Sequence, residues 1–247
     1  MVQRIAYVTG GMGGIGTSIC QRLAKEGHVV IAGCGPSRDY NKWINEQKEA
    51  GFTFHASVGN VADWDSTRDA FAKVREEHGN PDIVVNNAGI TRDGLFRKMS
   101  LDDWRGVIDT NLNSMFNVTK QVLDGMLEKG WGRIINISSV NGQKGQFGQT
   151  NYSTAKAGLH GFTMALAQEV ASKGVTVNTV SPGYIATEMV RAVPKEVLDT
   201  KIIPQIPVGR LGESEEIARA VVFLAADSAG FVNGACLDIN GGHYMAT

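Results

Sequence analysis

Tyr152 and Lys156 stand four positions apart in the segment Tyr152-Ser153-Thr154-Ala155-Lys156, inside an apolar pattern that predicts a helix. Residues four apart lie on one face of a helix, so both side chains are expected to project together. A phenol has a pKa near ~10 and is a poor acid at neutral pH, but a nearby ammonium stabilises the phenolate and lowers that pKa. The pair therefore predicts a tyrosine that can donate a proton.

Ser139 ends the apolar run 133–138, thirteen residues before the tyrosine. The run predicts a parallel strand, and open α/β sheets place their ligands at the carboxyl ends of such strands. The serine, the tyrosine and the lysine are therefore expected to meet over one substrate oxygen. The alternative is a surface Tyr/Lys pair beside a strand-end serine, because Tyr-x-x-x-Lys alone is a pattern that arises readily by chance.

The composition bounds the class of protein. The chain has 247 residues, of which 43% are hydrophobic and 20% charged, enough for one substantial core. A net charge of −1 gives no electrostatic signal for nucleic acid or an anionic membrane. Cys20, Cys34 and Cys236 are odd in number and widely spaced, which argues against disulfides and a zinc site. With no signal peptide or membrane span recognisable, we expect a soluble, cytoplasmic protein without a bound metal.

Short β-rich runs alternate with helical patterns along the whole chain, which is typical of βαβ units and a parallel sheet covered on both faces. The expected strands are 5–8, 29–32, 52–56, 83–85, 133–137, 175–180 and 236–239, and the clearest expected helices are 15–25, 41–50, 66–78, 102–126 and 152–172. No linker or repeat is present, so we expect one dinucleotide-binding catalytic domain over 1–247. The irregular segment 183–212, which contains three prolines, is interpreted as a mobile cap over the site.

A glycine-rich turn lies between the first expected strand and the following helix. The segment Thr9-Gly10-Gly11-Met12-Gly13-Gly14-Ile15-Gly16 fits G-x-G-x-x-G through its glycines 11, 13 and 16, and fits T-G-x-x-x-G-x-G through 10, 14 and 16. Glycines let backbone amides approach a pyrophosphate, and the helix N-terminus adds partial positive charge. The turn predicts a dinucleotide site, but the glycines alone do not fix which pattern applies.

The end of the second strand indicates which dinucleotide is bound. An acidic residue commonly ends this strand when NAD is the cofactor, but here small residues are followed by Ser37 and Arg38. An arginine suits a 2′-phosphate, so the sequence favours NADPH. The alternative is that Arg38 is a solvated loop charge offset by Asp39. Asn60-Val61, after the third strand, is expected to face the adenine.

The chain resembles the classical short-chain dehydrogenase/reductases. The likeness rests on motifs in the family's order: Thr9-Gly10-x-x-x-Gly14-x-Gly16, Asn86-Asn87-Ala88-Gly89, Asn111, Ser139, Tyr152-x-x-x-Lys156 and Ser181-Pro182-Gly183. The resemblance implies a single-domain Rossmann fold with a seven-stranded parallel sheet of order 3-2-1-4-5-6-7, helices on both faces, and hydride transfer from a nicotinamide.

The resemblance also implies roles for individual residues. Tyr152 donates the proton, Ser139 hydrogen-bonds the same carbonyl oxygen, Lys156 lowers the tyrosine pKa and binds the nicotinamide ribose, and Asn111 anchors a water that leads protons to the lysine. Many members have Asp at the position of Asn60, so adenine recognition is the weakest part of the likeness. The residues expected to contact the cofactor are Gly10, Met12, Gly13, Gly14, Ile15, Gly16, Gly35, Ser37, Arg38, Asn60, Val61, Asn87, Ala88, Gly89, Tyr152, Lys156, Pro182, Gly183, Ile185 and Thr187.

Within the family, the segment 138–152 is similar to the acetoacetyl-CoA reductases of polyhydroxybutyrate synthesis. This likeness implies NADPH-dependent reduction of acetoacetyl-CoA to (R)-3-hydroxybutyryl-CoA and a homotetramer. The residues expected to contact the substrate are Asp93, Lys98, Ser139, Gln146, Phe147, Gln149, Tyr152 and Tyr184. Phe147 and Tyr184 would supply apolar walls, while Arg92, Arg97, Lys98 and Lys144 would attract the phosphates of CoA. The alternative for each is an ordinary solvent-facing loop residue.

Two other functions remain open at this stage. A 3-ketoacyl-acyl-carrier-protein reductase shares the fold, the four residues Asn111, Ser139, Tyr152 and Lys156, and the reduction of a ketone. Such enzymes often carry a basic docking residue where this chain has Gly130, although Lys173 could serve docking. A non-catalytic dinucleotide-sensing protein on the same fold is the remote alternative. Such proteins usually lose the tyrosine or the lysine, and this chain keeps both.

Overall fold

A seven-stranded parallel sheet forms the centre of the computed structural model, which describes residues 2–191 and 193–246. The strands are β1 (Ile5–Val8), β2 (Val29–Cys34), β3 (His55–Val58), β4 (Ile83–Asn86), β5 (Gly132–Ile137), β6 (Val175–Pro182) and β7 (Cys236–Ile239). Their order across the sheet is β3-β2-β1-β4-β5-β6-β7, and every neighbouring pair is parallel. The predicted fold class and strand order are confirmed.

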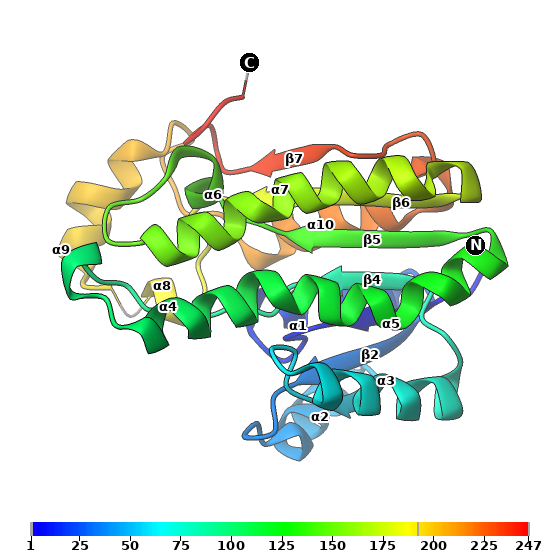
Figure 1. The fold of residues 1–247 in the computed structure, drawn as a ribbon. Helices are drawn as coiled ribbons and strands as arrows, with labels where there is room; N and C mark the ends of the chain where they lie inside the picture. The colour runs from blue at the N-terminus through cyan, green and yellow to red at the C-terminus, as the bar shows by residue number, and fades with distance from the viewer. Residues whose placement is uncertain (1, 192, 247) are drawn as a thin grey trace.

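Helices cover both faces of this sheet (Figure 1). They are α1 (Gly14–Lys25), α2 (Tyr40–Glu49), α3 (Trp64–His78), α4 (Leu101–Ile108), α5 (Ser114–Lys129), α6 (Val140–Lys144), α7 (Thr150–Val170), α8 (Glu188–Arg191), α9 (Lys195–Val197) and α10 (Ser214–Ala225). Helices α1 and α10 pack together on one face, and α3, α5 and α7 pack on the other.

The period-2 alternation of the strands produces two separate cores. In β1, Ala6 and Val8 are buried against the α1 and α10 side, whereas Tyr7 between them is buried with α3 and α5. In β4, Val84 likewise faces the second core while its neighbours face the first. A sheet buried on both faces needs apolar residues at nearly every strand position, which explains the continuous hydrophobic runs of the sequence.

Two expected elements differ from the structure, and local packing explains both. The third strand is 55–58 rather than 52–56, because Phe52 and Phe54 stack on each other and Phe54 also stacks on Trp43 of α2. The expected helix 102–126 is interrupted by a π-helical turn, Asp109–Asn113, between α4 and α5. Such turns occur frequently at functional sites.

The carboxyl ends of the strands gather at one edge of the sheet, where α4, α6, α8 and α9 also lie (Figure 1). The segment 183–212, expected as a cap, contains α8, α9, a π turn at Leu198–Ile202 and a 3-10 turn at Ile203–Gln205. It reaches this edge of the sheet, since Thr187 Cγ2 lies 3.2 Å from an ideal Cβ built on Gly14.

Candidate active site

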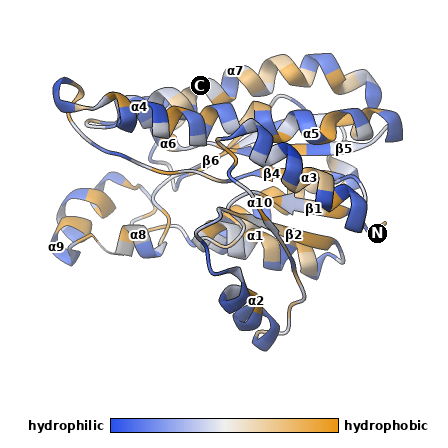
Figure 2. Ribbon diagram, turned by 60° about the horizontal axis from the view of Figure 1, so that its bottom comes forward, coloured by the Kyte–Doolittle hydropathy of each residue, from blue (hydrophilic) through white to orange (hydrophobic). Residues whose placement is uncertain are grey.

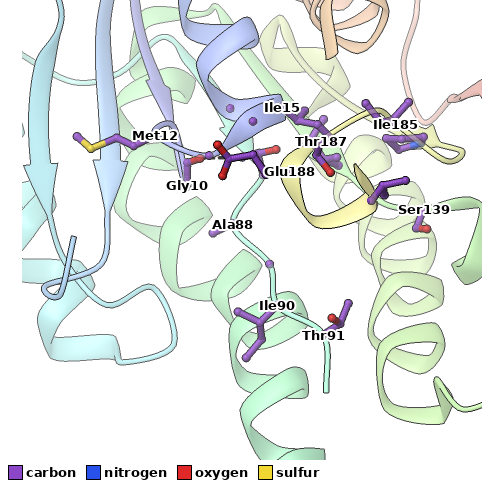
Figure 3. A pocket seen from close by; sticks show the side chains of 18 of the residues that line it. Gly10, Met12, Ile15, Ala88, Ile90, Thr91, Ser139, Ile185, Thr187 and Glu188 are labelled. Atoms are coloured by element: carbon purple, nitrogen blue, oxygen red, sulfur yellow. Dashed lines mark hydrogen bonds between the residues drawn. The ribbon is translucent and has the colours of Figure 1, made fainter. Parts of the chain in front are cut away.

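A cavity of about 520 Å³ opens at the carboxyl edge of the sheet (Figure 3). In the close-up, Gly10 and Met12 of the glycine turn lie toward one side and Ser139 toward the other. The cavity is lined by Gly10, Met12, Gly13, Gly14, Ile15, Gly16, Cys34, Gly35, Arg38, Asn87, Ala88, Gly89, Ile90, Thr91, Ile137, Ser138, Ser139, Tyr152, Lys156, Pro182, Gly183, Ile185, Thr187, Glu188 and Val190. Most of the residues expected to contact a dinucleotide are therefore brought together.

The glycine turn shows which of its glycines are required. Gly10 has φ of +60°, in the left-handed region that favours glycine, and a Cβ on Gly16 would lie 2.2 Å from Gly10 O. A Cβ on Gly14 would lie 3.2 Å from Thr187 Cγ2. A Cβ on Gly13 would meet only Gly10 O, at an ordinary 3.5 Å. This geometry favours the T-G-x-x-x-G-x-G pattern.

The asparagine-rich turn after β4 fixes the glycine turn in place. The Thr9 hydroxyl accepts hydrogen bonds from the backbone N–H groups of Asn87 and Ala88, both at 2.9 Å. The Asn87 side chain in turn donates to the carbonyls of Thr9 and Gly10, at 3.0 and 3.1 Å. Asn86 is buried and donates to Asn136 Oδ1 at 2.9 Å. These side chains hold two strand ends together, which is a structural role.

The arginine after β2 reaches the cavity. Arg38 Nη2 donates to Met12 O at 2.9 Å, so the guanidinium is held beside the glycine turn. Asp39 caps α2 by accepting from Lys42 N at 3.1 Å, which gives this carboxylate a partner of its own. A positive charge thus lies where the second strand ends, with its donors near the cavity.

Three residues expected to contact the cofactor are not among those lining this cavity: Ser37, Asn60 and Val61. Asn60 Oδ1 accepts from Ala62 N at 3.2 Å, so its amide helps to close the turn after β3. Val61 O accepts from Asn117 Nδ2 at 2.9 Å. The two residues after β3 therefore both form hydrogen bonds with other residues of the protein.

Ser139 and Tyr152 meet at the other side of the cavity. The Ser139 hydroxyl lies near the tyrosine phenol, and its Oγ accepts from Asn141 N at 3.1 Å. Burial raises the pKa of Tyr152, the nearby Ser139 hydroxyl lowers it, and the negative charge of Asp93 raises it. The net direction is upward, so the phenol keeps its proton through the neutral pH range.

Lys156 is buried and donates a hydrogen bond to the backbone of β5. Its Nζ donates to Ile137 O at 2.7 Å and lies 5.7 Å from the centroid of the Tyr152 ring. Burial lowers the pKa of this lysine to about 8. The expected lowering of the tyrosine pKa by the ammonium is not seen in this structure, where the pKa is shifted by burial, Ser139 and Asp93, and burial has the largest effect.

Asn111 lies in the π turn, beside the lysine. Its Oδ1 accepts from Ile90 N at 2.8 Å and its Nδ2 donates to Ile90 O at 2.9 Å. An ideal Cβ on Gly89 would lie 3.4 Å from Asn111 Oδ1 and 3.6 Å from Lys156 Nζ. Gly89 thus lets the three groups approach, and the π turn gives Asn111 its place there. The sequence identified the asparagine but not the turn that positions it.

Apart from Ser139 and Tyr152, the residues expected to contact the substrate are not among those that line this cavity. Asp93 and Gln149 are joined by a hydrogen bond of 2.8 Å, and Gly94 N donates to Gly148 O at 2.8 Å. Phe147 is 86% exposed. The remaining members are Gln146, bonded to Lys144 Nζ at 3.1 Å; Tyr184, stacked on His243; Lys98, exposed; and Arg92, paired with Asp103 at 3.2 Å.

Several lining residues escaped the sequence reasoning: Cys34, Ile90, Thr91, Ile137, Ser138, Glu188 and Val190. Most are apolar or small residues adjacent to recognised motifs, and only the strand-end rule could have pointed to them. Glu188, at the start of α8, carried no sequence signal. Among the described residues, no group of side chains that could hold a metal ion is found, and none of the described helices is long and apolar enough to cross a membrane.

Comparison with known proteins gives a consistent result. The model of the short chain dehydrogenase family matches residues 4–198. Acetoacetyl-CoA reductase of Cupriavidus necator is 69% identical over 246 residues, covering 99% of this chain and 100% of that protein. Acetoacetyl-CoA reductase of Allochromatium vinosum is 56% identical over 244 residues (98% and 99%). The 3-oxoacyl-(acyl-carrier-protein) reductase of Pseudomonas aeruginosa is 47% identical over 243 residues (98% and 98%).

Proposed function

Because this chain belongs to the short chain dehydrogenase family and is an oxidoreductase, we propose that it reduces acetoacetyl-CoA to (R)-3-hydroxybutyryl-CoA with NADPH. The observation that carries the proposal is the 69% identity, over essentially the whole of both chains, to a protein named acetoacetyl-CoA reductase. The polar groups that the reaction requires, on Ser139, Tyr152 and Lys156, all line the same cavity.

The chain supplies a proton donor and an oxygen site. Ser139 and Tyr152 both line the cavity and lie near each other, so a ketone oxygen placed against them meets two hydroxyl groups. The tyrosine phenol gives its proton to this oxygen, and the serine hydrogen bond stabilises the charge that develops there. A nicotinamide supplies the hydride when bound. Lys156 donates one hydrogen bond, to Ile137 O, so its ammonium has further N–H donors for a ribose hydroxyl.

The same groups give a physical reason why the hydroxyacyl product should have a single configuration. Ser139 and Tyr152 fix the oxygen, while the cofactor delivers hydride from one side of the carbonyl. The walls of the acyl pocket, Phe147 and Tyr184, would close it around a short chain. An extra methylene in a closed pocket costs roughly 1 to 3 kcal/mol in overpacking. We therefore propose a single product hand, for which the resemblance to the acetoacetyl-CoA reductases implies (R), and a preference for the four-carbon substrate.

The residues at the cofactor end fit a dinucleotide with a 2′-phosphate. The glycine turn leaves room for a pyrophosphate, and Arg38 holds its guanidinium beside that turn through Met12 O. Asp39 is engaged as the cap of α2, which leaves the charge of Arg38 for an anion. A charge-assisted bond to phosphate is the physical basis of the proposed preference for NADPH.

The rival substrate is a 3-ketoacyl chain on a carrier protein. Gly130 has φ of +65° and is the left-handed C-cap of α5, which explains why a glycine stands there instead of a basic docking residue. Gly130 and Lys173 precede β5 and β6, whereas Ser139 follows β5. Six residues of strand span about 20 Å, so within one subunit both positions lie at the edge of the sheet opposite the cavity.

We also propose that the protein is a homotetramer, formed through α4, α5, α7 and β7. Two of the small residues along α7 pack inside the chain: Ala155 is buried, and a Cβ on Gly158 would lie 2.9 Å from Leu112 Cδ1. Phe162, Met164 and Ala165 remain wholly or partly exposed on α7, which has apolar residues along its outward side (Figure 2). Light scattering at micromolar concentration tests the proposal, and a monomer would refute it.

The cellular role follows from the substrate. We propose that residues 1–247 form one catalytic domain in which 183–212 covers the substrate, and that the enzyme acts in the cytoplasm in polyhydroxybutyrate synthesis. A substrate that carries coenzyme A phosphates would be attracted by two exposed basic residues, Arg97 and Lys98.

One set of assays tests the proposed reaction. Loss of NADPH absorbance is measured with acetoacetyl-CoA and with an acetoacetyl-carrier-protein, each also with NADH, and acyl-CoA substrates of four to eight carbons follow. We expect the highest kcat/KM with acetoacetyl-CoA and NADPH, and an (R) product by chiral analysis. Higher efficiency with the carrier protein would support the rival function. An (S) product, or faster turnover of the eight-carbon substrate, would refute the proposed substrate while leaving the proton donor in place.

A further inference from the structure

A chain of three side chains lies next to two residues that line the cavity, since Asn141 N donates to Ser139 Oγ and the charge of Asp93 acts on Tyr152. Asn141 Nδ2 donates to Gln149 Oε1 at 2.9 Å, and Gln149 Nε2 donates to Asp93 Oδ2 at 2.8 Å. Asn141 is 91% buried in the first turn of α6, Gln149 is half-buried, and Asp93 is exposed on the loop after β4. The chain therefore connects the interior of the protein with its surface.

Gln149 stands at a helix N-cap, but its side chain does not cap the helix. It is the N-cap residue of α7, three residues before Tyr152, yet its side chain makes no capping hydrogen bond. Instead the amide bridges Asn141 and Asp93, so both of its ends are held by residues from other segments. The amide is thus held in a defined orientation at the start of the helix that carries Tyr152.

The direction of the hydrogen bonds is set by chemistry. An ionised carboxylate can only accept, so Asp93 requires the NH₂ group of Gln149, which turns Gln149 Oε1 toward Asn141. Asn141 must then present its own NH₂ group. Its Oδ1 is buried without a hydrogen-bond partner among the described residues, so this orientation costs one unpaired carbonyl. A reversed pair of amides would place Gln149 Oε1 against the carboxylate.

We propose that Asn141 is a positioning residue that orients the Gln149 amide, so that the substrate's acyl carbonyl meets the Nε2–H group. As the substrate enters, Gln149 Nε2 transfers its hydrogen bond from Asp93 to that carbonyl while Oε1 stays on Asn141. The inference rests on the proposed function, because it requires an acyl thioester at this mouth. It adds a buried residue, outside the cavity lining, that determines substrate affinity.

A double-mutant cycle in the intact enzyme tests this. The variants are Asn141→Leu, Gln149→Ala and the double variant, with KM and kcat measured for the β-ketoacyl thioester that the wild type reduces fastest. Loss of one hydrogen bond predicts a two- to tenfold lower kcat/KM for Asn141→Leu, mostly through KM for the thioester. In the Gln149→Ala background the same change should have less than a twofold effect.

Two further variants separate orientation from packing. Asn141→Asp keeps the volume but replaces the donor with acceptors, so Gln149 must turn its NH₂ group inward, and the loss should be at least as large as for leucine. Gln143→Leu is the matched control: it lies in the same helix and donates to Asp238 Oδ1 at 2.7 Å, away from Gln149. It should leave KM for the thioester within twofold. KM for NADPH should stay within twofold in every variant.

A crystal structure of the wild-type enzyme with its hydroxyacyl-CoA product gives a second measurement that needs no variant. Gln149 Nε2 should lie within hydrogen-bond distance of an acyl oxygen, with Oε1 still on Asn141. Equal effects of Asn141→Leu with and without Gln149, or a bound product out of reach of Nε2, would overturn the inference. Absence of activity on acetoacetyl-CoA in the wild type would instead refute the proposed substrate, because the cycle is defined for any accepted thioester.

Discussion

The burial of Lys156 leads to a prediction about the free energy of unfolding that is independent of the proposed catalytic mechanism. Lys156 is 4% exposed, and burial alone lowers its pKa from 10.5 to about 8. At pH 7 the ammonium is charged in both the folded and the unfolded chain, so the folded state bears the full unfavourable free energy of burying it. Since one pKa unit corresponds to ~1.36 kcal/mol, this amounts to roughly 3 kcal/mol.

Replacing the lysine with methionine should therefore stabilise the cofactor-free protein at pH 7 while abolishing activity. Methionine has a similar length and no charge, but it cannot donate to Ile137 O, a loss of about 1 kcal/mol. The expected net gain in the free energy of unfolding is about 2 kcal/mol. A stabilising change at a site residue of this kind reflects the trade between stability and function.

The pH dependence of that gain tests its origin. Between pH 8 and 10.5 the unfolded lysine binds a proton that the folded one has released, so the wild type gains stability relative to the methionine variant as pH rises. The raised pKa values of Tyr7, Cys20 and Cys236 lower the stability of both proteins above pH 9 and cancel in the difference.

The measurement is urea unfolding of both proteins without cofactor at one protein concentration, from pH 6.5 to 10. The advantage of Lys156→Met should be constant below pH 7 and should shrink steadily above pH 8. A variant that is less stable at pH 7, or a difference that does not change with pH, would show that the ammonium is not penalised by burial. That result would refute the electrostatic reasoning.

Three further outcomes are expected. Tyr152→Phe should lower the rate of reduction by roughly 100-fold or more, because it removes the general acid without changing ring volume. NADPH binding, measured by fluorescence titration, should stay nearly intact. Retention of a tenth of the wild-type rate would contradict the assignment of Tyr152 as the proton donor. Gly16→Ala should lower the melting temperature by several degrees, since its Cβ would lie 2.2 Å from Gly10 O, whereas Gly13→Ala, with an ordinary contact at 3.5 Å, should not. Arg38→Ala should reduce the preference for NADPH over NADH about ten- to a hundredfold in kcat/KM, and equal use of both cofactors by the wild type would contradict the role of the arginine.

The sequence predicted the sheet because its pattern is repeated and local. Each strand is an apolar run followed by a turn and an amphipathic helix, and packing on both faces requires that pattern. The predictions that were wrong concern segments whose sequence is compatible with more than one structure. Phe52 and Phe54 have strong strand propensity but stack with Trp43 of α2, and tertiary contacts of this kind override local propensity.

In the site, too, the residues of the motifs could be predicted, but their contacts with distant segments could not. Tyr152, Ser139 and Lys156 were predicted together from spacing and from the strand-end rule, and they line one cavity. The direction in which Lys156 points could not be predicted, because it depends on Ile137 O, nineteen positions away in sequence. The partners of Gln149 could not be predicted either, since Asp93 and Asn141 approach it from two different segments.

The pKa directions in the site explain how a tyrosine can remain ready to act in the cofactor-free protein. Burial and the charge of Asp93 keep the Tyr152 phenol protonated, and Ser139 lies near it on the wall of the cavity where a carbonyl oxygen would bind. The protein thus fixes the position of the proton donor by packing before anything binds. The acidity that transfer requires must come from groups brought close to the phenol when the cavity is filled, because the net effect of its surroundings in this structure is to raise its pKa.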